Sequence, residues 1–191
     1  MKYFFNNPSF YYAALVTLAA LICTYYQELF IYQRQLLEQG QLWRLFSGHF
    51  VHLNDKHLIL NLIAWIIIFF LGLNYLSLLK WVALLFILTL SISVGLYYFV
   101  PEILYYGGLS GVLHGYFTYI LVEWIKNKQR LAWIILLLLI AKTLIENFSD
   151  IGSSTAEYLD LRVVTEVHLI GVFIGILATL LTSYREHNSN Y

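Results

Sequence analysis

Long apolar stretches, separated by short polar segments, run through most of this 191-residue chain. A helix that crosses the hydrocarbon core of a bilayer, roughly 30 Å thick, needs about 20 apolar residues. Six stretches approach that length, and they cover residues 10–26, 57–79, 81–100, 109–125, 131–145 and 163–184. The pattern predicts an all-α, polytopic membrane protein whose six transmembrane helices form one domain over residues 1–191.

The longest connection between these stretches is residues 27–56, where charged residues are mixed with leucine, isoleucine, phenylalanine and tryptophan. Such a segment is too long for a tight turn between two helices. Its mixed character is typical of short helices that lie at a membrane surface. We therefore expect short interfacial helices in this first loop. No two stretches resemble each other, so an internal repeat is not expected.

Composition narrows the class of protein. Hydrophobic residues make up 60% of the chain and charged residues 12%, with a mean hydropathy of +0.71, whereas soluble domains carry about 25% charged residues. A soluble enzyme and a disordered chain are therefore excluded, and membrane lipids are the expected surroundings. The formal net charge is zero, so no nucleic-acid partner is expected. The single cysteine, Cys23, permits neither an internal disulfide nor a cysteine zinc site.

Lysine and arginine set the expected orientation. With six spans both termini lie on one side, and that side carries six of these residues against four in the longer loops of the opposite side. Cytoplasmic loops carry the excess of lysine and arginine in membrane proteins. The termini are therefore expected in the cytoplasm. The first loop and the acidic segment of residues 149–162 are expected to face outward.

Polar residues inside apolar spans are costly and usually functional, and Ser110 is the first candidate. It stands in Gly107-Gly108-Leu109-Ser110-Gly111 at the start of the fourth span. The flanking Gly108 and Gly111 let backbone approach closely, and the free N–H groups of a helix start favour negative charge. These are features of an oxyanion site beside a nucleophilic serine. The alternative is an ordinary helix N-cap with small residues for packing.

His168 is the expected partner of Ser110. It lies near the outer end of the sixth span and shares one helical face with Gly171 and Gly175, which indicates a closely packed neighbouring helix. If the fourth span is that neighbour, a neutral imidazole takes the serine proton and later returns it to a leaving amine. The alternative is a structural histidine bonded to a carbonyl group.

Two further polar residues lie at the same level of the predicted bundle. His57 and Asn61 are four residues apart at the outer end of the second span and share one helical face. They are candidate hydrogen-bond donors to an oxyanion, the alternative being a polar pair that holds two helices together. His114, one turn after Ser110, is expected to stack on or bond to His168, either tuning it or only packing against it.

Histidines at positions 49, 52 and 57 suggest a metal site, but their spacing is irregular for one helix and no carboxylate motif accompanies them. No metal or other cofactor is therefore expected. Lys142 and Glu146 are also four residues apart, in the region of the fifth span. We expect Lys142, and also Glu166 in the sixth span, to form ion pairs or to reach toward the membrane interface.

Together these motifs resemble the rhomboid intramembrane serine proteases. They are Trp43-Arg44 in the first loop, His57-x-x-x-Asn61 in the second span, Gly108-Leu109-Ser110-Gly111 in the fourth and His168-x-x-Gly171-x-x-x-Gly175 in the sixth. The resemblance covers about residues 40–180 and implies the family's six-helix core. It implies a Ser110–His168 catalytic dyad without an aspartate, and oxyanion donors at His57, Asn61 and the Ser110 backbone. It implies supporting roles for His114, Gly108, Gly111, Gly171, Trp43 and Arg44.

The segment Gly108–Gly115 is similar to the rhombosortase branch, in which a histidine, here His114, replaces the tyrosine of better-known bacterial rhomboids. That resemblance implies a serine endopeptidase of the bacterial inner membrane whose active site opens toward the periplasm. Its substrates would be secreted proteins that end in a Gly-Gly motif and a transmembrane sorting tail. The alternatives are a catalytically inactive rhomboid-like protein that binds membrane clients, a small transporter or channel, and a haem or metal protein. A transporter needs polar residues along a whole pathway, which the spans lack.

Overall fold

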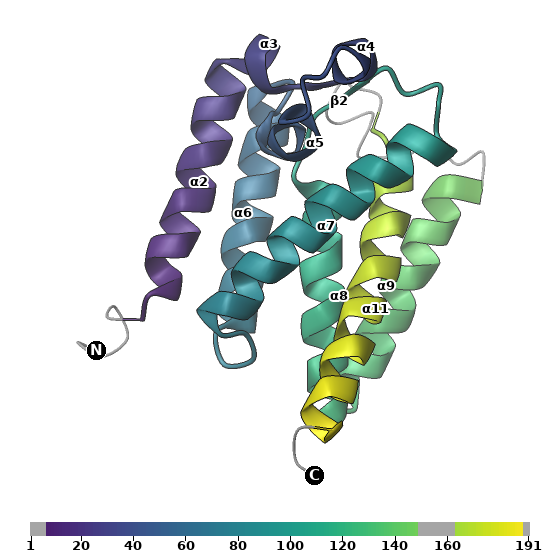
Figure 1. Ribbon diagram of the computed structural model, residues 1–191. Coiled ribbons are helices and arrows are strands. Elements are labelled where there is room, and N and C mark those ends of the chain that lie inside the picture. The colour runs from purple at the N-terminus through teal and green to yellow at the C-terminus, as the bar shows by residue number, and fades with distance from the viewer. Residues whose placement is uncertain (1–6, 149–162, 189–191) are drawn as a thin grey trace.

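A computed structural model of the chain describes residues 7–148 and 163–188. The acidic segment of residues 149–162, expected to face outward, lies outside these ranges. Most of the described chain is helical (Figure 1). The long ones are α2 (Ser9–Tyr25), α6 (Asp55–Gly72), α7 (Leu78–Phe99), α8 (Ser110–Lys126), α9 (Leu131–Phe148) and α11 (Glu166–Asn188). The predicted helical architecture is confirmed for this part of the chain.

Three of these helices, α6, α7 and α9, are long and apolar enough to cross a membrane, judged by length and composition. Helix α2 and residues Glu166–Thr182 of α11 are apolar but shorter, and α8 has 17 residues. The described residues therefore form a helical protein with three candidate membrane spans. The six-span topology stays a prediction.

The turn between α6 and α7 comes earlier than the hydropathy pattern indicates, because α6 ends at Gly72 and not near residue 79. A Cβ at Gly72 would lie 2.6 Å from the Trp81 ring, so the two helices meet closely at this point. The Ser77 hydroxyl accepts a hydrogen bond from the Lys80 N–H at 3.3 Å and caps the start of α7. Hydropathy does not reveal this turn because one of its residues, Leu76, is apolar and buried.

The first loop contains the short helices expected of it. They are α3 (Gln27–Phe30), α4 (Arg34–Glu38), α5 (Arg44–Ser47) and the 3-10 turn η1 (Gly48–Phe50). The loop also contains a strand that the sequence does not predict, since β1 (Tyr32–Gln33) pairs antiparallel with β2 (Tyr105–Tyr106). Two residues are too few to show the alternation of a strand.

Trp43 and Arg44 hold this loop together. The buried guanidinium of Arg44 donates hydrogen bonds to the carbonyl oxygens of Ile31 at 2.7 Å and Glu28 at 3.1 Å. The exposed indole of Trp43 donates to the carbonyl oxygen of Leu29 at 3.2 Å. These bonds attach the side chains of Trp43 and Arg44 to backbone carbonyl oxygens in and next to α3. The Trp43-Arg44 motif therefore supports the loop.

Helix α8 lies at the centre of the bundle and packs against α6, α7, α9 and α11 (Figure 1). Its Tyr116 hydroxyl donates to the Trp81 carbonyl oxygen at 2.6 Å and lies 2.8 Å from the Tyr12 hydroxyl, so these buried phenols are paired. Trp65 packs edge-on against Trp81, with ring centroids 5.6 Å apart. This aromatic cluster joins α2, α6, α7 and α8.

Helices α8 and α11 approach each other through glycines. A Cβ at Gly171 would collide with the carbonyl oxygen of Gly111, and one at Gly175 would lie 2.5 Å from the carbonyl oxygen of Gly115. Larger side chains at these positions would push the helices apart. The close neighbour predicted from the glycine spacing is therefore α8, and these glycines set the separation of the two faces that carry the polar residues described next.

Candidate active site

Ser110 is the first residue of α8, and the short connection from β2, residues 107–109, ends in a bend at Leu109. Gly108 in this segment has a φ angle of +144°, a conformation that favours glycine, and a Cβ there would lie 2.8 Å from the imidazole of His57. The Tyr106 hydroxyl donates to the Gly108 carbonyl oxygen at 2.5 Å and lies 3.4 Å from Nδ1 of the buried His49. The backbone before Ser110 is thus held by α6 and by the first loop.

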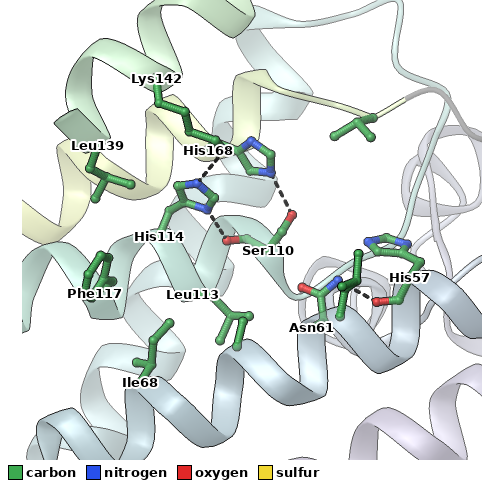
Figure 2. Close-up of a pocket in the computed structure, with 13 residues that line it drawn as sticks. His57, Asn61, Ile68, Ser110, Leu113, His114, Phe117, Leu139, Lys142 and His168 are labelled. Atoms are coloured by element: carbon green, nitrogen blue, oxygen red, sulfur yellow. Dashed lines mark hydrogen bonds between the residues drawn. The ribbon is translucent and has the colours of Figure 1, made fainter. Parts of the chain in front are cut away.

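His168, in the first turn of α11, faces Ser110 across the helix pair (Figure 2). Its Nε2 lies 2.9 Å from the Ser110 Oγ, and its Nδ1 lies 3.2 Å from Oε2 of Glu146 on α9. An ionised carboxylate only accepts hydrogen bonds, so Nδ1 carries a proton and donates a hydrogen bond to Glu146. Nε2 is then free to accept a hydrogen bond from the serine hydroxyl. Only 4% of His168 is exposed, which shields this contact from bulk water.

His114 stacks on His168, with ring centroids 4.2 Å apart and ring planes inclined by 14°. Its Nδ1 lies 2.8 Å from the carbonyl oxygen of Ser110, which only accepts, so Nδ1 carries the proton in this ring as well. Its Nε2 therefore accepts a hydrogen bond from the ammonium group of Lys142 at 3.1 Å. The predicted contact between the two imidazoles is confirmed.

The ion pair between Lys142 and Glu146 is also confirmed, with Nζ 2.9 Å from Oε2. The contact between Glu146 and His168 is not predicted from the sequence, because the i,i+4 partner Lys142 accounts for the carboxylate without a second contact. One sequence signal was available: Glu146 and His168 both lie at the outer ends of their apolar stretches. Antiparallel neighbouring helices would bring two such residues to the same level.

His57 and Asn61 line the same cavity as Ser110 and His168. The Asn61 side-chain amide donates to the His57 carbonyl oxygen at 2.9 Å, which uses one of its two N–H groups and leaves the other for a ligand. The His57 ring lies edge-on to His52, with centroids 4.9 Å apart. The cavity therefore combines a serine hydroxyl, an imidazole that accepts its proton and two side chains with hydrogen-bond donors.

The cavity has a volume of about 220 Å³, and apolar side chains form much of its wall. They include Leu60 and Ala64, together with Ile68, Leu113, Phe117 and Leu139. Figure 2 labels the last four. Along α6 the lining passes from His57 to Ile68, a distance of about three helical turns. An apolar cavity with polar groups gathered around a serine fits a peptide segment that carries apolar side chains.

Two neighbouring histidines support the loop. Burial lowers the pKa of His49 to about 4, and burial together with the nearby His57 lowers the pKa of His52 to about 3. Nε2 of His49 bonds to the Thr89 carbonyl oxygen at 3.0 Å, and Nδ1 of His52 to the Phe50 carbonyl oxygen at 3.1 Å. Within residues 7–148 and 163–188, no cluster of three or more His, Cys, Asp or Glu residues is arranged to hold a metal ion.

Comparison with known proteins finds one family, since the model of the rhomboid domain matches residues 39–185. The chain belongs to the rhomboid family. Rhomboids are in general intramembrane serine proteases, and with its apolar helices this rhomboid is a membrane protein. The match begins directly after α4 and includes every residue of the cavity. No curated protein matches the chain.

This rhomboid brings together Ser110, His168, His114, His57 and Asn61, all of which the sequence singles out. Gly108 and Gly111 adjoin Ser110 in the chain, and Gly171 lies against Gly111 in the contact between α8 and α11. Trp43 and Arg44 do not line the cavity. Their bonds lie within the first loop.

Proposed function

We propose that this rhomboid is an intramembrane serine protease in which Ser110 is the nucleophile and His168 the general base. The observation that carries the proposal is the 2.9 Å contact between Ser110 Oγ and His168 Nε2 at a largely apolar cavity. A catalytically inactive rhomboid that only binds membrane clients has no need of a base aligned on a serine hydroxyl. The geometry therefore supports the protease over that alternative.

In the proposed reaction Ser110 Oγ attacks the carbonyl carbon of the scissile peptide bond while His168 Nε2 takes the hydroxyl proton. The oxyanion accepts hydrogen bonds from the Ser110 backbone N–H, Asn61 and His57. The carbon–nitrogen bond then breaks, and the leaving amine takes the proton from His168. Water then hydrolyses the acyl-enzyme by the same two stages. It loses a proton to His168 as it attacks the acyl carbon, and the departing Ser110 oxygen recovers that proton. This mechanism uses no metal or cofactor.

The proposed topology has six transmembrane helices and both termini in the cytoplasm. Figure 1 supports it, because the start of α2 and the end of α11 lie at one end of the bundle and the first loop lies at the other. The 17 residues of α8 span about 25 Å, less than the roughly 30 Å bilayer core. With its last turn at the cytoplasmic face, α8 would hold Ser110 slightly below the outer surface of the membrane.

For substrates we propose secreted bacterial proteins that end in a Gly-Gly motif and a transmembrane tail, cut at the periplasmic side of the inner membrane. The apolar cavity wall supports a membrane-embedded substrate. The Gly-Gly preference rests on the resemblance of Gly108–Gly115 to rhombosortases, in which His114 is the distinguishing residue. Its stacking on His168 at 4.2 Å is consistent with that branch.

The test is co-expression of the rhomboid with a secreted reporter that carries such a tail, followed by mass spectrometry of the reporter's C-terminus. We expect the parent protein to remove the tail and Ser110→Ala to leave it in place. A second reporter with Leu-Leu in place of Gly-Gly separates the two parts of the proposal. Equal cleavage of both reporters would contradict the Gly-Gly preference alone, whereas equal cleavage by Ser110→Ala would contradict the proposed nucleophile.

A further inference from the structure

We propose that Glu146 positions His168 as the third member of a Ser110–His168–Glu146 triad, and that Lys142 holds its carboxylate in place. This inference rests on the proposed protease function. It departs from the dyad that the rhomboid resemblance implies, in which no acidic residue supports the histidine. Glu146 touches neither substrate nor reacting atoms, so its role is to orient the base.

The geometry around His168 carries the proposal. Glu146 Oε2 lies 3.2 Å from Nδ1, the ring nitrogen opposite the one that faces Ser110. The Glu146 side chain is 11% exposed and that of His168 5%. A carboxylate with so little access to water is costly unless it is paired, and the Lys142 ammonium at 2.9 Å supplies the pair.

A second set of bonds fixes the distance between Glu146 and His168. The Asn147 side chain, next to Glu146, donates to the Thr165 carbonyl oxygen at 3.1 Å, and the same oxygen accepts from the His168 N–H at 3.0 Å. The Thr165 hydroxyl in turn donates to the Glu146 carbonyl oxygen at 3.4 Å. The end of α9 is therefore tied to the start of α11 beside the catalytic pair, independently of the ion pair.

The contacts form a closed chain that fixes the protons of both imidazoles. The Ser110 carbonyl oxygen bonds to His114, and His114 bonds to Lys142. Lys142 pairs with Glu146. Glu146 bonds to His168, which bonds back to the Ser110 hydroxyl. Glu146 accepts the Nδ1 proton of His168 and so keeps Nε2 ready as a base. When His168 takes the serine proton, the carboxylate stays ionised and offsets the new positive charge. No proton passes to Glu146.

The charged and titratable groups near His168 come from several helices. Glu146 and Lys142 face it from α9, His114 from α8 and His57 from α6, and Glu166 lies on α11 itself. Helix α7 meets α11 through Gly95 and the apolar Ile170. Glu146 is the only carboxylate that bonds to the His168 ring in the part of the chain that the structure describes, so its removal tests the triad directly.

The experiment compares Glu146→Gln with the matched control Glu123→Gln in purified full-length protein reconstituted in lipid. Glu123 pairs with Lys126 at the far end of α8 and has no contact with the cavity. In a soluble serine protease, loss of the corresponding carboxylate charge lowers kcat by about 10⁴. Here His114 and Lys142 remain, so we expect Glu146→Gln to lower kcat roughly tenfold or more with little change in KM.

We also expect the acidic limb of the pH–rate profile of Glu146→Gln to move to lower pH, because the protonated imidazole loses its stabilising carboxylate. The control should keep the parent's kcat and profile. Parent kcat and an unmoved acidic limb in Glu146→Gln would overturn the triad while leaving the protease intact. A parent protein no more active than Ser110→Ala would instead overturn the proposed function.

A measurement on the parent protein covers the case in which Glu146→Gln does not fold. Nitrogen-15 NMR of labelled histidine, with the His168 signal assigned by its loss in His168→Gln, reports which ring nitrogen carries the proton. We expect the proton on Nδ1 at neutral pH. The 1H resonance of that proton should lie strongly downfield, as expected for a hydrogen bond to a carboxylate. A proton on Nε2 would overturn the triad without any change to Glu146.

Discussion

At the centre of the site two imidazoles are stacked, and their neighbours fix the proton of each. His114 donates to the Ser110 carbonyl oxygen and accepts from Lys142, whereas His168 donates to Glu146 and accepts from Ser110. Two rings with centroids 4.2 Å apart cannot both carry a positive charge at low cost where little water screens them. A neutral His114 therefore gives His168 a flat surface and leaves the base function to one ring.

The first prediction concerns His114. Replacing it with alanine removes the stacked ring and the bond to the Ser110 carbonyl oxygen, so we expect kcat to fall by about tenfold, equivalent to about 1.4 kcal/mol in the transition state. His114→Tyr keeps a ring beneath His168, so its kcat should fall less than that of His114→Ala. Steady-state rates on a tailed substrate measure both variants. Parent rates in both would show that His114 is only a packing residue.

The predicted proximity of Ser110, His168 and His114 agrees with the structure, because helical spacing and flanking glycines are local signals. Ser110 and His114 share a helical face because they are four residues apart. His168 shares a face with Gly171, and a glycine on that face indicates a close neighbouring helix. The contact of Glu146 with His168 depends on how α9 is rotated and tilted against α11. Their positions at the outer ends of two apolar stretches place both residues at one level, but no local pattern sets the rotation of the helices, so the contact itself is seen only in three dimensions.

Among the helices, the pair α8 and α11 determines whether the serine and its base meet. The glycines on both helices let their backbones touch, and this contact fixes their separation more strictly than long side chains would. The helix ends are harder to predict from sequence. Gly72 ends α6 inside an apolar run, and β1 with β2 is too short to leave a pattern.

The second prediction tests this helix pair through Gly171→Ala. The added Cβ would collide with the Gly111 carbonyl oxygen, and overpacking of this kind typically costs about 1–3 kcal/mol. We expect a lower thermal midpoint and a loss of activity, because α11 must move away from Ser110. Phe173→Ala, on the same helix and 59% exposed, is the control and should keep the parent rate. A Gly171→Ala protein with parent midpoint and rate would contradict the close contact.

The third prediction concerns the first loop and acid. Burial lowers the pKa of His49 from 6.5 to about 4, so between these values the unfolded chain binds a proton that the folded chain does not. The free energy of unfolding must then fall as the pH falls through this range. We expect the thermal midpoint to decrease from neutral pH toward about pH 5. At neutral pH the thermal midpoint of His49→Gln should be lower than that of the parent, because the contact of residue 49 with α7 changes. Its thermal midpoint should also depend less on pH. Parallel curves for parent and variant would assign the acid sensitivity to other groups.

Across the whole molecule, the cavity takes part of its lining from the first turns of α6, α8 and α11. In Figure 1 these turns lie toward the end of the bundle opposite the start of α2 and the end of α11. Helices α6, α8 and α11 all begin at that end, which brings His57, Ser110 and His168 to one level. The proposed orientation therefore places all the catalytic chemistry near one membrane surface. The same orientation places Glu102 of the α7–α8 connection and Lys128 of the α8–α9 connection on opposite sides of the membrane.

The fourth prediction tests that orientation with single cysteines. The native Cys23 is buried, so Cys23→Ser provides a background in which Glu102→Cys or Lys128→Cys is the sole thiol. Both positions are exposed. In bacterial spheroplasts, a membrane-impermeant maleimide should label Glu102→Cys at once and Lys128→Cys only after lysis. Labelling of both before lysis, or of Lys128→Cys alone, would contradict the proposed topology.

The central claim, that His168 activates Ser110 as a nucleophile, is tested most directly by covalent capture. A fluorophosphonate probe reacts with an activated serine and leaves an adduct that peptide mass spectrometry locates. We predict one adduct, on Ser110, that forms readily in the parent protein and at least tenfold more slowly in His168→Asn, since the general base contributes about 10²–10⁴ in rate. No adduct in the folded parent, an adduct on another residue, or equal labelling of His168→Asn would contradict the account.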